Sequence, residues 1–204
     1  MTDAAFWDRI APRYAKSPIS NVDAYEATLA RVRTYLGPRS KVLELGCGTG
    51  MTALKLHQNT ASYTATDISP GMIEIAKERL TDVDAPHPAF EVGGVSAEDL
   101  RTHDANTVLA FNLLHLVPNL ETTLKDIHAA LPENGLFISK SPALGEKWYL
   151  RPLIGAMQLI GKAPYVRSFK INALDKMIET AGFRIDETAL FGSMPSRFVV
   201  ARKV

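Results

Sequence analysis

The feature that most constrains this chain is a short apolar run that ends in three alternating glycines. Residues 42–50 read Val-Leu-Glu-Leu-Gly-Cys-Gly-Thr-Gly, and a helical pattern begins at Met51. Glycine lets the backbone turn tightly and lets a ligand approach closely, because no Cβ stands in the way. This order predicts a strand, a ligand-binding turn and a helix; the alternative is an ordinary glycine-rich turn without a ligand.

Strand-like apolar segments alternate with helical patterns along most of the chain, which is typical of βαβ units and a mostly parallel sheet. We therefore expect an α/β fold, with a Rossmann-like seven-stranded sheet and helices on both faces. The expected strands cover residues 41–45, 62–66, 89–92, 107–111, 136–140, 184–190 and 197–202. The expected helices cover residues 22–36, 51–58, 70–80, 120–131 and 173–181.

The length of 204 residues fits one domain over residues 1–204. Residues 1–36 are expected to form an N-terminal arm and helix, in which the first 20 residues are a loosely ordered arm or lid. Residues 142–170 are too long for a simple connection and mix aromatic residues with cations. We expect this insertion to shape a substrate pocket; a dimer contact or a plain surface helix is the alternative.

Composition excludes several classes of protein. The formal net charge of +1 gives no electrostatic case for nucleic acid or an anionic membrane. The single cysteine, Cys47, excludes an internal disulfide and fits a reducing cytoplasm. The N-terminus lacks the apolar core of a secretory signal, and residues 153–161 are too short to span a bilayer. The expectation is a soluble, cytoplasmic protein.

The ligand at the glycine turn follows from the third glycine and the nearest carboxylate. A dinucleotide-binding G-x-G-x-x-G turn that began at Gly46 would have its third glycine at residue 51, but here it is Gly50. Glu44 also places a carboxylate where it would repel a pyrophosphate. S-adenosylmethionine has no phosphate and carries a cationic ammonium and a sulfonium, so the pattern favours this cofactor over NAD.

A second carboxylate, Asp67, ends the second expected strand. Parallel neighbours end at the same edge of a sheet, so Asp67 is expected beside the glycine turn, where it can accept hydrogen bonds from both ribose hydroxyls. The alternative is a solvated helix-capping aspartate. Ile68 and Met72 are expected to face the adenine ring, or else to be core residues.

These segments resemble the class I methyltransferase family, particularly its small-molecule branch typified by the quinone-biosynthesis enzymes. The resemblance covers residues 6–136 and implies the class I methyltransferase fold with S-adenosylmethionine as cofactor. Residues 42–50 resemble the first motif of that family and residues 65–80 the second. The cofactor-binding residues it implies here are Glu44, Gly46, Cys47, Gly48, Gly50, Asp67, Ile68 and Met72, together with Ser96, Ala97, Glu98 and Asn112. Ser96 stands where the family usually has an aspartate, which weakens the expected adenine contact.

Residues 111–117 resemble the fourth-strand motif of the family, beside the sulfonium and the substrate. Here His115 is the candidate general base, because its ordinary pKa is near neutral; a structural packing role is the alternative. Tyr14 is the second candidate catalytic residue, placed to close over the cofactor or touch the substrate. The histidines show no metal-ligand spacing, so no metal is expected.

The sequence thus predicts an S-adenosylmethionine-dependent methyltransferase acting on a small organic metabolite, hydrophobic or anionic. Methylation of protein or RNA, and a non-catalytic cofactor-binding partner protein, are the alternatives. An NAD-dependent dehydrogenase is disfavoured by the position of Gly50. A homodimer is compatible with the insertion at residues 142–170.

Overall fold

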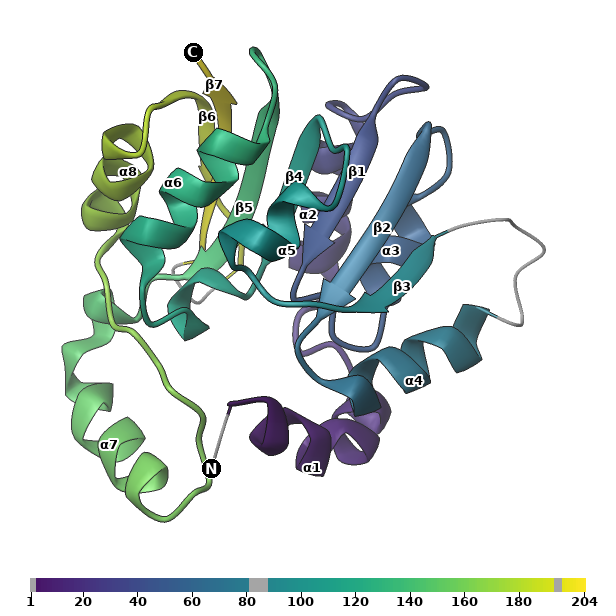
Figure 1. Cartoon of the computed structure of the whole chain (residues 1–204). Helices are drawn as coiled ribbons and strands as arrows, with labels where there is room; N and C mark the ends of the chain where they lie inside the picture. The colour runs from purple at the N-terminus through teal and green to yellow at the C-terminus, as the bar shows by residue number, and fades with distance from the viewer. Residues whose placement is uncertain (1–2, 81–87, 193–195) are drawn as a thin grey trace.

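A computed structural model describes residues 3–80, 88–192 and 196–204. They form one seven-stranded sheet in the order β3-β2-β1-β4-β5-β7-β6, in which β7 runs antiparallel to both its neighbours (Figure 1). The strands are β1 (Lys41–Leu45), β2 (Ser62–Asp67), β3 (Ala89–Val92), β4 (Thr107–Phe111), β5 (Leu136–Pro142), β6 (Phe183–Leu190) and β7 (Ser196–Lys203). The predicted seven-stranded, mostly parallel α/β fold is confirmed.

Helices cover both faces of the sheet (Figure 1). The helical elements are α1 (Asp3–Lys16), α2 (Val22–Arg33), α3 (Met51–Leu56), α4 (Pro70–Leu80), α5 (Ala97–Arg101), η1 (Leu114–Leu116), α6 (Leu120–Ala130), η2 (Leu144–Leu150), α7 (Arg151–Leu159) and α8 (Ile171–Thr180). One apolar core lies between the sheet and α5, α6 and α8, and the other between the sheet and α2, α3 and α4. Because both faces are covered, the central strands are apolar on both sides.

The strand order determines where a ligand can bind. β1 pairs with β2 on one side and with β4 on the other, so the chain order reverses direction at β1 and β4. In open α/β sheets, ligands bind at such a switch point, beyond the carboxyl ends of the strands. That edge of the sheet is the lower one in Figure 1, where α1 also lies.

The first 20 residues are not the loosely ordered arm that the sequence predicts. Residues 3–16 form the helix α1, even though Pro12 interrupts its hydrogen bonding. Phe6 and Ala11 are buried and α1 packs against α4. Tertiary packing, which local sequence does not reveal, supports this helix.

Several local predictions are confirmed. The Ser69 hydroxyl accepts a hydrogen bond from the Met72 amide at 3.1 Å, as expected for the cap residue that directly precedes α4. Gly182 follows α8 with a φ of +105°, as expected for a helix end. Within the described ranges, no helix is long and apolar enough to cross a membrane.

Candidate functional site

The glycine turn lies at the carboxyl end of β1. Gly46, Gly48 and Gly50 have φ values of +65°, +55° and +78°, in the left-handed region that glycine adopts without strain. The Cys47 amide donates to the Thr66 carbonyl at 2.9 Å, which holds the turn against β2. The turn therefore forms a cradle at the switch point of the sheet, with space beside Gly48, where the nearest atom to a Cβ would be 3.8 Å away.

Asp67 lies beside this turn, as the sequence predicts. Its Oδ2 accepts a hydrogen bond from the Gly48 amide at 2.9 Å, and its Oδ1 accepts one from the Ser69 amide at 3.0 Å. Burial raises the pKa of the Asp67 carboxyl, and the two amide hydrogen bonds oppose that rise. A carboxylate is thus held at a fixed position between the glycine turn and the start of α4.

Glu44 is the second carboxyl group of the site. It is almost fully buried, and its Oε2 accepts a hydrogen bond from the Tyr63 hydroxyl at 2.8 Å. Burial raises the pKa of Glu44 to about 8. A neighbouring cation would favour the ionised form, so the group is suited to respond to a positively charged ligand.

The helix α1 covers the glycine turn. Arg79 of α4 donates to the Thr49 carbonyl at 2.9 Å and, through its other terminal nitrogen, to the Ala15 carbonyl at 3.0 Å. Asp8 accepts hydrogen bonds from the Ser69 hydroxyl and the Gly71 amide. Sequence reasoning missed both Asp8 and Arg79, because nothing in the local pattern joins them to the turn.

Tyr14 of α1 lies next to the cradle. A Cβ built on Gly48 would be 3.8 Å from Cε1 of Tyr14, and the tyrosine is 49% exposed. Burial of the hydroxyl and the charge of Asp67 raise the pKa of Tyr14. The tyrosine is therefore beside the turn and within the field of Asp67.

The residues expected near the adenine lie after β3. The Gly93 amide donates to the Asp67 carbonyl at 3.0 Å, so this stretch runs next to β2. The Ser96 hydroxyl is already paired with Asp99 at 2.6 Å in a capping box at the start of α5. Ala97 and Glu98 form the first turn of α5, so they directly follow the stretch that runs next to β2.

Of the two apolar residues expected at the adenine, Ile68 is 39% exposed at the edge of the site. Met72 is almost fully buried on α4. Ile68 is thus accessible from the site, whereas Met72 packs within the protein.

Asn112 and His115 lie beyond β4. Asn112 has a φ of +54°, and its amide donates to the Lys140 carbonyl at 2.7 Å. His115 is in η1, where burial lowers the pKa of its imidazole to about 4. His115 is therefore neutral at physiological pH, and its Nδ1 has no hydrogen-bond partner among the residues that the structure describes.

These residues fit S-adenosylmethionine. The cradle leaves room beside Gly48 for close approach of a ligand, and Asp67 and Glu44 are two carboxyl groups that could pair with ribose hydroxyls and a cationic amino group. Within residues 3–80, 88–192 and 196–204, no group of three or more metal-ligating side chains occurs.

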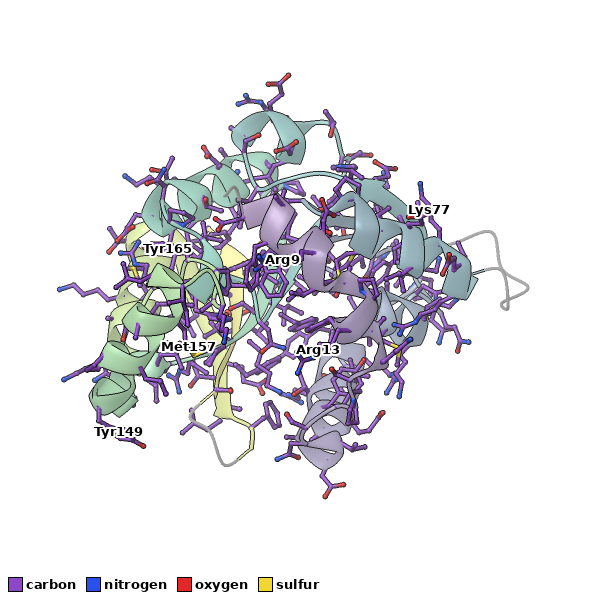
Figure 2. All side chains as sticks on the ribbon, turned by 90° about the horizontal axis from the view of Figure 1, so that it is seen from below. Arg9, Arg13, Lys77, Tyr149, Met157 and Tyr165 are labelled. Carbon is purple, nitrogen blue, oxygen red and sulfur yellow. The ribbon has the colours of Figure 1, made fainter. Side chains whose placement is uncertain are left out.

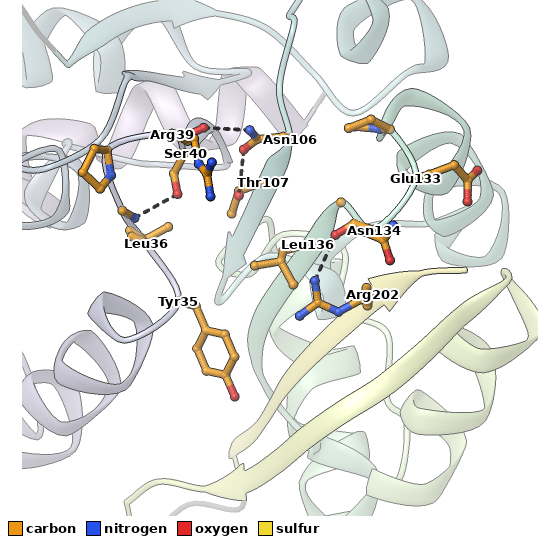
Figure 3. Close-up of a pocket in the computed structure, with 14 residues that line it drawn as sticks. Tyr35, Leu36, Arg39, Ser40, Asn106, Thr107, Glu133, Asn134, Leu136 and Arg202 are labelled. Carbon is orange, nitrogen blue, oxygen red and sulfur yellow. Dashed lines mark hydrogen bonds between the residues drawn. The ribbon is translucent and has the colours of Figure 1, made fainter.

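A surface hollow of about 540 Å³ lies at the opposite edge of the sheet (Figure 3). Its lining includes Tyr35, Arg39, Asn106, Asn134 and Arg202. Except for Arg202, which is near the end of β7, these residues lie in the connections that precede β1, β4 and β5. None of the predicted site residues lines the hollow, so it is separate from the candidate site.

Several solved structures with this arrangement are named as methyltransferases. Magnesium protoporphyrin IX methyltransferase from Synechocystis is 20% identical, with a TM-score of 0.69 and coverage of 98% of this chain and 94% of that one. A Thermotoga maritima SAM-dependent methyltransferase is 18% identical, with a TM-score of 0.74 and coverage of 99% and 100%. The fold is that of the class I methyltransferases, which take their methyl group from S-adenosylmethionine.

Sequence comparison identifies the family. A model described as a methyltransferase domain matches residues 19–188. The hybrid PKS-NRPS synthetase mpsA of Macrophomina phaseolina is 32% identical over 123 residues, or 56% of this chain and 3% of the synthetase. The chain thus spans only a small part of the curated relatives it matches. It belongs to the methyltransferase-domain family, and the predicted class and cofactor are confirmed.

Proposed function

We propose that this protein transfers a methyl group from S-adenosylmethionine to a small organic acceptor, and that the predicted site residues hold the cofactor. The observation that carries the proposal is the fixed position of Asp67, which joins the glycine turn to the start of α4 at the switch point. Relatives named as polyketide synthases and a neighbour named for magnesium protoporphyrin IX support an organic metabolite as acceptor.

In this proposal the cofactor supplies an activated methyl group on a cationic sulfonium. Asp67 accepts hydrogen bonds from the ribose hydroxyls, and the amides of the glycine turn lie against the amino-acid portion. Glu44 ionises near the positive charge. The chain then has to align the acceptor with the methyl group and exclude water from it.

His115 is proposed as the base for acceptors that must lose a proton. Its low pKa keeps the imidazole neutral and able to accept a proton, although the same low pKa makes it a weak base. It therefore suits an acceptor whose proton is already acidic. Tyr14 is proposed to close the cofactor side of the site from α1.

The residues that α1 and the insertion place at the carboxyl edge of the sheet support an acceptor that is hydrophobic or anionic. Seen from the carboxyl edge of the sheet, Arg9 and Arg13 of α1 lie across from Met157 and Tyr165, which belong to the insertion at residues 142–170 (Figure 2). Arg9 also donates to the Gly161 carbonyl at 2.6 Å and so connects α1 to the insertion. Cations on one side and apolar groups on the other suit an apolar molecule with a negative group.

Calorimetric titration with S-adenosylmethionine, S-adenosylhomocysteine and NAD tests the cofactor site. We expect both adenosyl compounds to bind, and Asp67→Ala to weaken them at least about tenfold, because a charge-assisted pair of hydrogen bonds is lost. Asp104→Ala removes an exposed aspartate and is the matched control. Tight NAD binding without response to either adenosyl compound would overturn the proposal.

The cellular location and the oligomeric state are also proposals. The single cysteine supports the cytoplasm, and the near-neutral net charge supports an acceptor other than nucleic acid. A homodimer is supported by apolar side chains exposed on and after α7, among them Leu153, Leu159 and Ile160. Sedimentation of the wild type and of Leu159→Glu tests it, since a dimer through this face would dissociate in the variant.

A further inference from the structure

The end of β5 carries buried hydroxyl groups that the site described so far does not use. Ser139 and Ser141 are two residues apart and therefore lie on the same face of the strand, the one on which Phe137 packs into the core with α6 and α8. Both serines are 0% exposed, and neither hydroxyl has a partner within the described part of the chain. Buried hydroxyls are normally paired, because they lose their hydrogen bonds to water.

A third unpaired polar atom, His115 Nδ1, lies next to this end of β5. The hydrogen bond from the Asn112 amide to the Lys140 carbonyl places the start of the β4–η1 connection beside Ser141. His115 follows in η1, which contacts β5. The carboxyl ends of β4 and β5 therefore bring His115 and the two serines to the same edge of the sheet.

The fourth unpaired atom, Ser168 Oγ, comes from the far end of the insertion. The Arg167 amide donates to the His115 carbonyl at 2.7 Å, and the Gly145 amide donates to the Phe169 carbonyl at 2.8 Å. Ser168 lies between these two contacts. It is therefore on the stretch of chain that runs from η1 to the residues that follow β5. Three segments far apart in sequence thus converge with buried, unpaired polar groups.

An unpaired buried atom alone does not indicate a ligand. Nε2 of His128 is also unpaired, but His128 lies at the end of α6 against Phe183, with ring centroids 5.0 Å apart. A Cβ built on Gly182 would lie 2.7 Å from that nitrogen, so the space there is filled. What distinguishes the group at β5 is its position at the edge of the sheet where ligands bind.

Two arginines near this group are already paired with carboxylates. Arg197 is the β7 register partner of Ser141, and its guanidinium donates to Asp175 at 3.0 Å. Arg167 donates to Glu121 at 2.7 Å. The polar atoms left for a ligand are uncharged hydroxyls and an imidazole, which suit a neutral oxygen better than a carboxylate or a phosphate.

We propose that Ser141, Ser168 and His115 form a polar cradle that binds a neutral carbonyl or hydroxyl oxygen of the methyl acceptor. Ser139, two residues before Ser141 on β5, belongs to the same cradle. This inference rests on the proposed function, since the acceptor has to lie at the carboxyl edge next to the methyl donor. It also assigns the two ends of the acceptor: a neutral oxygen lies in the polar cradle, and any negative group lies toward Arg9 and Arg13 of α1 (Figure 2).

The test uses the full chain saturated with S-adenosylhomocysteine and two probes of similar shape, acetophenone with a neutral carbonyl and benzoate with a carboxylate. Nuclear magnetic resonance of labelled histidine ring nitrogens reports binding, and His115→Gln identifies the signals of His115. We expect acetophenone to shift those signals and benzoate to leave them unchanged. Ser141→Ala and Ser168→Ala should each weaken acetophenone about fivefold, the effect of one neutral hydrogen bond. Ser62→Ala, at an exposed position on β2, is the control.

Thermal unfolding separates ligand binding from a structural role. Removing an unpaired hydroxyl should leave the melting temperature of Ser141→Ala unchanged or raise it, and Ser141→Thr should retain probe binding. A lower melting temperature with unchanged probe affinity would mean that the hydroxyl holds a structural water, and the inference would be wrong. His115 signals that acetophenone leaves unmoved, or that benzoate shifts as much as acetophenone does, would also overturn it. If S-adenosylhomocysteine itself fails to bind, the proposed function fails first.

Discussion

The hydroxyl of Ser69 donates a hydrogen bond of 2.6 Å to Oδ1 of Asp8, although 61 residues separate the two in sequence. The same oxygen accepts a hydrogen bond from the Gly71 amide at 2.9 Å. Amides in the first turn of a helix have no partner in their own helix, so Asp8 caps α4 from outside. This contact fixes α1 over the glycine turn.

Replacing Asp8 should therefore release α1 from the site. In Asp8→Ala we expect faster amide hydrogen exchange at Gly71 and weaker binding of S-adenosylhomocysteine. Asp8→Asn keeps an acceptor oxygen, so its exchange rate and its affinity should lie between those of Asp8→Ala and the wild type. Hydrogen exchange followed by mass spectrometry measures the first effect and calorimetry the second. Identical exchange in the wild type and Asp8→Ala would contradict a capping role.

The same contact should depend on pH. Hydrogen bonds from the Ser69 hydroxyl and the Gly71 amide lower the pKa of Asp8 below its ordinary value of 3.8. A lowered pKa in the folded state contributes stability above the ordinary value, and that stability is lost as the pH falls through the folded value. We expect α1 to loosen only in acid, below about pH 4, with no such step in Asp8→Ala. Exchange at Gly71 across this range measures it.

Arg79 should control the glycine turn from the other end of α4. In Arg79→Lys the planar guanidinium, with its two terminal nitrogens, is replaced by a single ammonium. One ammonium cannot reach both the Thr49 and Ala15 carbonyls. We expect cofactor affinity to fall several-fold while the chain remains folded. Lys77→Ala, an exposed position on the same helix, is the control. Equal affinity in wild type and Arg79→Lys would show that the turn holds its shape without this clamp.

Gly50 should be the glycine least tolerant of a side chain. A Cβ there would lie 2.7 Å from Cζ of Phe90 and 2.9 Å from Cβ of Ala76, at a φ of +78°. We expect Gly50→Ala to lower the free energy of unfolding by about 2–4 kcal/mol, from backbone strain and overpacking together. Gly37→Ala, where nothing lies within 4 Å, should change it little. Urea unfolding measures both, and equal losses in the two variants would refute the packing argument.

Glu44 should link cofactor binding to proton release. Its pKa of about 8 means that the carboxyl is mostly protonated at pH 7 in the free protein. A cationic ligand favours ionisation, so we expect S-adenosylmethionine to bind with release of a proton. Calorimetry in buffers of different ionisation enthalpy measures the release. In Glu44→Gln the heat should become independent of buffer, and a buffer dependence that persists would assign the proton to another group.

The raised pKa of Glu44 also predicts how stability changes with pH. A raised pKa in the folded state contributes stability that is complete below the ordinary value of 4.5 and is lost as the pH rises through about 8. The melting temperature of the free protein should therefore fall across this window, and that of Glu44→Gln should fall less. A flat profile in the wild type would mean that Glu44 is already ionised.

Much of the fold was predictable because its signals are local. Alternating apolar segments predicted the strands, and Ser69 and Gly182 marked helix ends that the structure confirms. Helix ends such as that of α2, which stops at Arg33 instead of residue 36, were less accurate because terminal turns depend on packing. The helix α1 was missed because Pro12 weakens its local pattern and its stability comes from α4.

The sequence by itself determined the glycine turn, the carboxylates Glu44 and Asp67 and the α/β class, because each depends on residues close together in the chain. Only the tertiary structure decided that Tyr63 pairs with Glu44, that Asp8 caps α4 and that the unpaired Ser141 and Ser168 converge near His115. Those relations depend on strand register and on how distant segments pack at one edge of the sheet. No periodicity along the chain encodes either, so they appear only when the chain is folded.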